Sequence, residues 1–535
     1  MTKRSRLPLA AAALWVLPLW VVALPPMVDY PQQLALSAIL RWYSDPARRF
    51  RETYELALWA PHGLFKLLTA GLAWAVPINV AGKLIVSASL LAVGAAALAV
   101  CRRTGRPGWY ALLALALTYN TVFYWGFVDN LLALPLALGG AAMADRLLDR
   151  PVTARPWLAL AGVTVLFYTV HLQFLLLFAG TVGWLAICRL SSSRTNREDW
   201  RRLALWLSAL VPGLVACGAV MAYGVLRSPV GVISEYERRM RSSPPLRLPL
   251  TTKLARVPDI LFGPYPDRTG WVLLGLLAAT AILAIAFRDR TVGCAVRTGD
   301  GAEGAHSAPY GSALFRSRFA TLAGWLALLY LVLPEFRGGY LIAERVAPLA
   351  AMLAVVALPP PAAGRRRLVA ALVAGVLVFQ FGQTLSAFLR FRAESAGLTE
   401  LLAGTEPGQN LAGLIFERES ASWRGVPVYL HFPAWYQAAK GGRILFSFAE
   451  LFQTSARFRP GASWDDLLRE WSDWNPRFFN YERHGGRFRY FLVRGGPADV
   501  VNAFGGDPGR LGLAGKTAGE WWLFERKEPP RGSNP

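Results

Sequence analysis

Long apolar stretches recur along roughly the first 390 residues, and they constrain the fold more than any other feature of the sequence. A helix needs about 20 mostly apolar residues to cross the hydrocarbon core of a membrane. Windows that approach this length lie near 7–27, 79–100, 108–124, 127–144, 157–171, 172–188, 203–226, 269–287, 318–333, 346–359 and 368–388. The hydrophobic fraction of 54% exceeds what one soluble core can bury. The sequence therefore predicts a polytopic α-helical membrane protein with about eleven transmembrane helices.

Clusters of arginine between these windows predict the orientation of the chain. Cytoplasmic loops of membrane proteins carry an excess of Lys and Arg. The basic clusters near 3–6, 102–106, 146–155, 189–202, 288–297 and 365–367 all fall on one side if the N-terminus is cytoplasmic. The net charge of +23 then reflects topology, and we expect no nucleic-acid partner because the basic residues share no polar face. We expect a multi-pass protein of the bacterial inner membrane with an extracytoplasmic C-terminus.

A further apolar stretch, residues 62–78, would reverse this orientation if it crossed the membrane. Its residues His62, Lys66 and Trp74 suit a helix that lies along the membrane surface with its apolar face in the acyl boundary. We therefore expect an interfacial helix at 62–78, inside a first outer loop at 28–78. This loop belongs to a membrane domain at 1–390.

The composition changes near residue 393, and short apolar runs then alternate with turn residues. The runs at 411–417, 427–433, 487–495 and 520–526 are typical of strands. Candidate helices lie between them, around 434–440, 447–455 and 464–471. This alternation predicts a separate soluble α/β domain at 393–535.

Two aspartates lie at the outer edges of membrane segments, where an ionisable group is a candidate for function. Asp29 follows the first window directly, and Asp129 lies at the turn between the windows 108–124 and 127–144. Either could instead cap the helix that follows it. The predicted topology nevertheless brings both carboxylates to the same outer face.

This layout resembles the C superfamily of glycosyltransferases (GT-C), polytopic enzymes that take a sugar from a polyprenyl-phosphate carrier at the non-cytoplasmic face. In protein O-mannosyltransferases and lipid A aminoarabinose transferases the first outer loop carries an acidic residue near its start, and the next outer loop carries another. Asp29 and Asp129 match these positions, although Tyr30 and Pro31 follow Asp29 where several of these families have a second acidic residue. The resemblance implies that Asp29 and Asp129 are catalytic, with a carboxylate to deprotonate the acceptor hydroxyl.

The leaving phosphate would need cations near the outer interface. Arginines that depart from the positive-inside trend lie in two outer loops. The substrate-binding candidates are Tyr30, His171, Arg238, Arg239, Glu335, Arg337 and Arg345. Local pairing with neighbouring glutamates is the alternative for the arginines, and an interhelical hydrogen bond is the alternative for His171.

No His or Cys group has metal-ligand spacing, so we predict no metal site and no cofactor. The resemblance implies membrane lipid and a polyprenyl-phosphate sugar donor as partners, with a glycan, lipid or protein as the acceptor. We therefore expect a glycosyltransferase of the cell envelope. A transporter or flippase of a lipid-linked or polysaccharide substrate is one alternative, and a non-enzymatic scaffold of an envelope complex is another.

Overall fold

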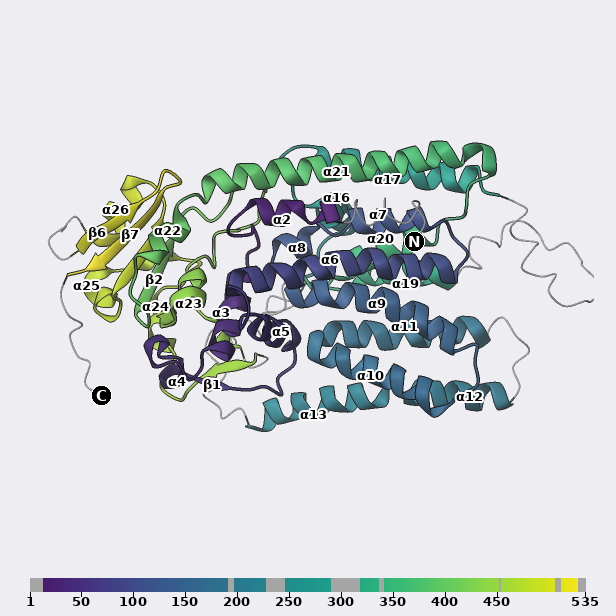
Figure 1. The fold of residues 1–535 in the computed structure, drawn as a ribbon, viewed down its shortest axis with the longest axis horizontal. Helices are drawn as coiled ribbons and strands as arrows, with labels where there is room; N and C mark the ends of the chain where they lie inside the picture. Colours follow the sequence, from purple (N-terminus) through teal and green to yellow (C-terminus); the bar gives the residue numbers. More distant parts are fainter. Residues whose placement is uncertain are drawn as a thin grey trace, which may run out of the picture.

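The computed structural model describes residues 13–190, 197–227, 246–289, 318–335, 341–451, 454–505 and 511–527. Its helices lie side by side along the longest axis of the molecule, and a small sheet lies at one end of this bundle (Figure 1). We call the end of the bundle that carries the sheet the sheet end. The short helices and the strand of the first outer loop, residues 28–78, also lie at the sheet end (Figure 1).

Each predicted membrane window contains a helix or part of one. The helices are α2 (Leu17–Val21), α6 (Ile78–Arg103), α7 (Ala111–Ala116), α8 (Thr121–Tyr124), α9 (Val128–Leu147), α10 (Ala154–Val170), α11 (Leu172–Leu190), α12 (Arg197–Ser208), α13 (Val211–Arg227), α17 (Thr269–Ala286), α19 (Arg318–Val332), α20 (Val346–Val356) and α21 (Arg366–Glu394). Helices α15 (Leu250–Ala255) and α16 (Val257–Phe262) lie outside the windows, between 203–226 and 269–287. Within the described ranges, 4 of them are long and apolar enough to cross a membrane, namely α6, α11, α17 and the helix that contains α21. The pair formed by α12 and α13, bent by 41°, would make a fifth. The predicted count of eleven is not confirmed.

The window 108–124 illustrates why hydropathy overestimates the number of full spans. It is divided into a short 3-10 turn, α7 and α8, because the Asn120 side chain accepts a hydrogen bond from the Phe123 amide and starts a new helix. Hydropathy is insensitive to such a polar cap inside an apolar run. The described part of the first window contains helical residues 13–15 and α2, separated by a turn at Val16.

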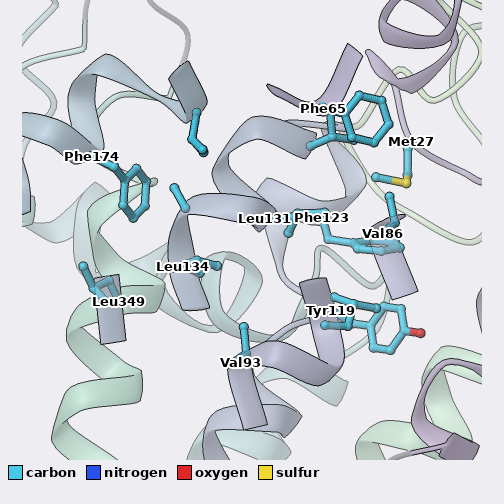
Figure 2. Close-up of a cluster of buried hydrophobic side chains, with 14 of the residues drawn as sticks. Met27, Phe65, Val86, Val93, Tyr119, Phe123, Leu131, Leu134, Phe174 and Leu349 are labelled. Carbon is cyan, nitrogen blue, oxygen red and sulfur yellow. The ribbon is translucent and has the colours of Figure 1, made fainter. Parts of the chain in front are cut away.

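Apolar side chains form one core that runs from the bundle into the C-terminal region. Figure 2 shows part of this core, to which Val86 of α6, Phe123 of α8, Leu131 of α9, Phe174 of α11 and Leu349 of α20 contribute. Other large apolar side chains face outward, and Leu176, Ile187, Ile282 and Val378 are examples at 60–68% exposure. An apolar outer surface of this kind is what a lipid-facing bundle requires.

The first loop holds α3 (Tyr30–Arg41), α4 (Phe50–Thr53), strand β1 (Tyr54–Leu56) and α5 (Leu64–Leu72). At nine residues, α5 is about 14 Å long and cannot cross a membrane. Leu67, Leu72 and Trp74 are exposed on and beside it, with Trp74 at 75%. These features fit the expected surface helix, although its position in the membrane interface stays a prediction.

The C-terminal region contains a five-stranded sheet with the order β3-β2-β5-β7-β6. Its strands are β3 (Arg443–Ile444), β2 (Asn410–Ile415), β5 (Tyr490–Arg494), β7 (Trp521–Arg526) and β6 (Leu511–Lys516). The first three are parallel and the last two pairings are antiparallel. Three of the four predicted strands are therefore present as β2, β5 and β7.

The fourth predicted strand, 427–433, is wrong, because this segment forms a series of turns that leads into α23 (Ala434–Lys440). Every residue in the segment is buried. Pro427 and Pro433 lack the N–H groups that a central strand would need. The predicted helix at 464–471 is present as α24 (Asp465–Glu470), whereas only a 3-10 turn, Phe448–Glu450, is described within 447–455.

The C-terminal region also pairs with and packs against the first loop. Strand β1 pairs antiparallel with β4 (Ala456–Phe458), which lies some 400 residues later in the sequence. Helix α23 packs against α3, and the Gln437 side chain donates a hydrogen bond of 2.7 Å to the Tyr54 hydroxyl. The first loop and the C-terminal region are therefore joined by backbone pairing as well as by their common core.

Candidate active site at the sheet end of the bundle

Backbone pairing brings the start of the first loop against the turn that precedes α9. The amides of Val28 and Asp29 donate hydrogen bonds of 3.0 Å to the carbonyls of Tyr124 and Trp125, respectively. Asp29 itself is the residue directly before α3, and its side chain makes no capping hydrogen bond there. Asp29 therefore does not cap α3 with its side chain, and its carboxylate is available to interact with other side chains.

Gly126 makes this close approach possible. Its φ of +74° favours glycine, and a Cβ at this position would lie 2.7 Å from the amide nitrogen of Asp29. Two residues further on, α9 begins, and Asp129 lies in its first turn. A short, tightly packed segment thus places the two predicted aspartates at the same end of the bundle.

Asp129 forms a buried ion pair with a residue of α5. Lys66 Nζ lies 2.7 Å from Asp129 Oδ2, and the two side chains are only 2% and 9% exposed. The other carboxylate oxygen, Oδ1, is buried and has no hydrogen-bond partner among the described residues. Burying two charges costs several kcal/mol per ion, so such a pair is a candidate for function more than for stability.

Arg345 adds a second cation next to this pair. It lies in the turn before α20, and one guanidinium nitrogen is 3.3 Å from His171 Nε2. Its guanidinium also stacks over the Phe127 ring at 4.1 Å. Burial lowers the pKa of Arg345 to about 10, while the nearby carboxylates of Asp29 and Asp129 oppose this effect. Arg345 therefore stays charged at neutral pH and attracts both aspartates.

Two histidines line the same region. The rings of His62 and His171 meet edge to face with centroids 4.5 Å apart, and the His62 carbonyl accepts a hydrogen bond from Lys66. His62 has a φ of +60°, which is uncommon for a residue other than glycine and is typical of functional sites. Burial, followed by the charges of Lys66 and Arg345, lowers the pKa of His62 to about 3, so this imidazole is neutral.

Asp29 faces a histidine of the C-terminal region. Asp29 Oδ1 lies 3.5 Å from His431 Nε2, and the other ring nitrogen, Nδ1, lies 3.2 Å from Asp473 Oδ2. Burial raises the pKa of Asp29 to about 6, whereas His431 and Arg345 act to lower it. A carboxylate with a pKa just below neutral is suited to general base catalysis, because it is ionised and still accepts a proton readily.

Glutamates in this part of the chain pair with a different arginine. Arg256 lies 2.6 Å from Glu335 and 3.1 Å from Glu344. Burial raises the pKa of Glu344 to about 7. The local pairing considered for Arg345 is therefore not formed, and Glu335 is engaged by Arg256 at the ends of α16 and α19.

The structure brings together four of the predicted site residues, Asp29, Asp129, His171 and Arg345. Tyr30, which follows Asp29, is fully buried and packs edge to face on Phe65 and Trp435. The predicted residues Arg238, Arg239 and Arg337 lie outside the described residues.

Sequence reasoning missed the functional candidates Lys66, His431 and Asp473. Lys66 carried a signal, since a lysine inside an apolar stretch is a candidate for function. We interpreted it instead as a surface anchor of the interfacial helix. No signal in the sequence marks His431 or Asp473, because only the fold brings them to Asp29. Over the described ranges, no group of three or more His, Cys, Asp or Glu side chains is arranged to hold a metal ion.

Comparison with known proteins places the fold. No family model and no curated protein matches the sequence. Two solved structures match over 98% of this chain and 98% of their own, at 12% identity. They are crystal structures of ArnT from Cupriavidus metallidurans, one bound to undecaprenyl phosphate (TM-score 0.56) and one in the apo state (TM-score 0.55). This chain therefore shares the fold of these ArnT structures.

Proposed function

We propose that this chain transfers a sugar from a polyprenyl-phosphate donor to an acceptor at the sheet end of its bundle, on the outer face of the bacterial inner membrane. The observation that carries the proposal is the buried Lys66–Asp129 pair, with Arg345 and Asp29 in the same region. The fold adds support, since an ArnT structure of this fold holds undecaprenyl phosphate.

Cations serve the leaving group in this proposal. When the bond between the anomeric carbon and the phosphate oxygen breaks, negative charge develops on the phosphate. Lys66 pairs with Asp129 and Arg345 attracts both aspartates, and a phosphate that displaced Asp129 from Lys66 would keep the lysine paired. Arg345 would supply a planar, permanently charged donor set that matches phosphate oxygens.

Asp29 serves the acceptor. Its carboxylate takes the proton of the acceptor hydroxyl while the acceptor oxygen attacks the anomeric carbon. Asp129 holds Lys66 in place until the donor arrives. We give Tyr30 a packing role between α5 and α23, on the basis of its complete burial. His171 orients Arg345 through their contact.

The test is sugar transfer from a radiolabelled polyprenyl-phosphate donor in membranes that contain equal amounts of each variant. Asp29→Asn removes the base and keeps the side-chain size, so we expect transfer to fall about 10²- to 10⁴-fold. Asp267→Asn is the matched control, because Asp267 is exposed and its oxygen only caps α17 by accepting the Thr269 amide. Activity of Asp29→Asn at the level of the control would remove Asp29 from the mechanism.

A further inference from the structure

His431 lies between two carboxylates that approach it from opposite sides. Nε2 faces Asp29 at 3.5 Å and Nδ1 faces Asp473 at 3.2 Å. His431 and Asp473 are 6% and 7% exposed. Because the carboxylates face different ring nitrogens, they do not converge on a single point as metal ligands would. One carboxylate therefore lies within ion-pair distance of each ring nitrogen.

The first loop holds this histidine in position. The His431 ring stacks on Phe446 at 5.4 Å and meets Phe448 edge to face at 5.5 Å. The buried Gln32 side chain donates to the Phe446 carbonyl at 2.9 Å and accepts from the Phe448 amide at 3.1 Å. Gln32 lies on α3, one turn after Asp29, so the helix that begins after Asp29 also fixes the rings around His431.

This geometry determines how protons are shared. A carboxylate next to Nδ1 favours the tautomer that carries its proton on that nitrogen, which leaves the Nε2 lone pair facing Asp29. Asp29 and Nε2 can then share one further proton. Either the carboxyl carries it and the imidazole is neutral, or the imidazole carries it and both carboxylates are ionised.

We propose that His431 is a positioning residue that keeps Asp29 ionised and takes from it the proton released by the acceptor. The inference rests on the proposed transfer reaction. The acceptor O–H bond breaks, its oxygen bonds to the anomeric carbon, and the polyprenyl phosphate leaves with the electron pair of the broken bond. The proton moves to Asp29 and then to Nε2, which restores the carboxylate.

The imidazolium then loses its proton to solvent. A small cavity whose lining includes Gln32, Gly413, Phe446, His431 and Asp473 borders the ring. The soluble part of the chain thereby contributes directly to the proton balance of a reaction in the membrane part.

The pH dependence of transfer separates this role from a purely structural one. The charged groups that face Asp29 are the cations His431 and Arg345 and the anion Asp473. A positive His431 lowers the pKa of Asp29, so its removal raises that pKa and moves the acidic limb of the profile to higher pH. We expect a shift of about one pH unit in His431→Gln.

His484→Gln is the matched control, because His484 is also a buried histidine of the C-terminal region that pairs with a carboxylate, Glu470. We expect its acidic limb to stay where it is in wild type. A lower rate in His431→Gln with an unmoved acidic limb would overturn the proposal, since loss of packing alone lowers rates at every pH.

A second measurement needs no activity. The protonated carboxyl of Asp29 gives an infrared band that Asp29→Asn removes, and its pH midpoint should rise in His431→Gln but not in His484→Gln. Wild-type protein that transferred no sugar would refute the proposed function, whereas an unmoved band midpoint would refute the coupling.

If His431→Gln does not fold, His431→Asn replaces it in both measurements. The acidic limb and the band midpoint of Asp29 should again move to higher pH. Unmoved values of both would overturn the coupling.

Discussion

At the scale of single residues, the sheet end is defined by charges that depend on one another. Asp129 pairs with Lys66, while Arg345 attracts both Asp29 and Asp129. Removal of Lys66 alone leaves the Asp129 carboxylate buried without its partner, which is more costly than the absence of both charges. This dependence explains why a substitution can affect stability and catalysis in different directions.

Asp29→Asn should be more stable than wild type at neutral pH although it is inactive. The pKa of Asp29 is raised from 3.8 to about 6, so the folded state binds the proton more tightly than the unfolded chain does. The stability that this group contributes is complete below about pH 4 and is lost as the pH rises through about 6.

We therefore expect Asp29→Asn to gain on the order of 2 kcal/mol over wild type at pH 8 and nothing at pH 4. Thermal unfolding in detergent between these pH values measures the difference, with Asp267→Asn as the control. If the difference in stability between Asp29→Asn and wild type did not vary with pH, burial would impose no penalty on the ionised form of Asp29.

A double-substitution cycle on Lys66 and Asp129 separates structure from function. Lys66→Met leaves a buried unpaired carboxylate and should destabilise the protein by about 3–5 kcal/mol. Adding Asp129→Leu removes that charge, so the double variant should recover most of this loss. Transfer should stay absent in both variants, because the phosphate has lost a cation. An active double variant would mean that the pair has only a structural role.

Sequence alone could predict the residues whose position in the chain already implies their position in space. Asp29, Asp129, His171 and Arg345 all lie at the edges of apolar windows, so topology brings them to one end of the bundle. His431 and Asp473 lie in a region whose packing no local pattern predicts. Lys66 is an intermediate case. The sequence predicts the helix that holds it but not the burial of its side chain against Asp129.

At the scale of elements, apolar periodicity predicted where helices occur but not where they break. The window 108–124 is interrupted at Asn120, and the short helix α8 that begins there ends at the carbonyls that bind the backbone of Asp29 and Val28. The segment 427–433 was mistaken for a strand because it is apolar throughout. In the fold every residue of this segment is buried, and its turns place His431 in the interior of the molecule.

Gly126→Ala should disrupt the site through the backbone. The new Cβ would lie 2.7 Å from the Asp29 amide nitrogen, so the turn and the start of α3 must separate and two hydrogen bonds are weakened. Gly105→Ala is the matched control, since Gly105 also has a positive φ of +66° but has open space around its Cβ position.

We expect the control to lose about 1 kcal/mol of stability from backbone strain alone and to keep its activity. Gly126→Ala should lose more stability than this and at least tenfold in transfer rate. Thermal unfolding and the radiolabel assay measure the two effects. Equal behaviour of the two variants would show that the close approach at Gly126 does not position Asp29.

At the scale of the whole molecule, the membrane part and the C-terminal region form a continuous unit at the sheet end. Strand β1 of the first loop pairs with β4, and the main core extends to residues of the sheet such as Leu411. Residues 393–535 also hold a separate core around Leu414, Trp471 and Phe491. Independent folding of residues 393–535 stays a prediction. In the isolated region, β4 and α23 would lack their partners β1 and α3 of the first loop.

The arginine clusters predict that the sheet end faces away from the cytoplasm. An alkaline phosphatase fusion after Pro530 should be active, and a fusion within 289–317 should be inactive. A cytoplasmic reporter at the same two positions serves as the control and should give the opposite pattern. Phosphatase activity in the 289–317 fusion alone would reverse the orientation and place the proposed reaction on the cytoplasmic side.

The most direct test of the account is an experimental structure of the protein with polyprenyl phosphate. We predict that the phosphate lies within hydrogen-bond distance of Lys66 Nζ and the Arg345 guanidinium, with the Asp29 carboxylate on the side from which an acceptor would approach. A lipid phosphate bound elsewhere, with the Lys66–Asp129 pair intact and closed to it, would contradict the proposed reaction centre.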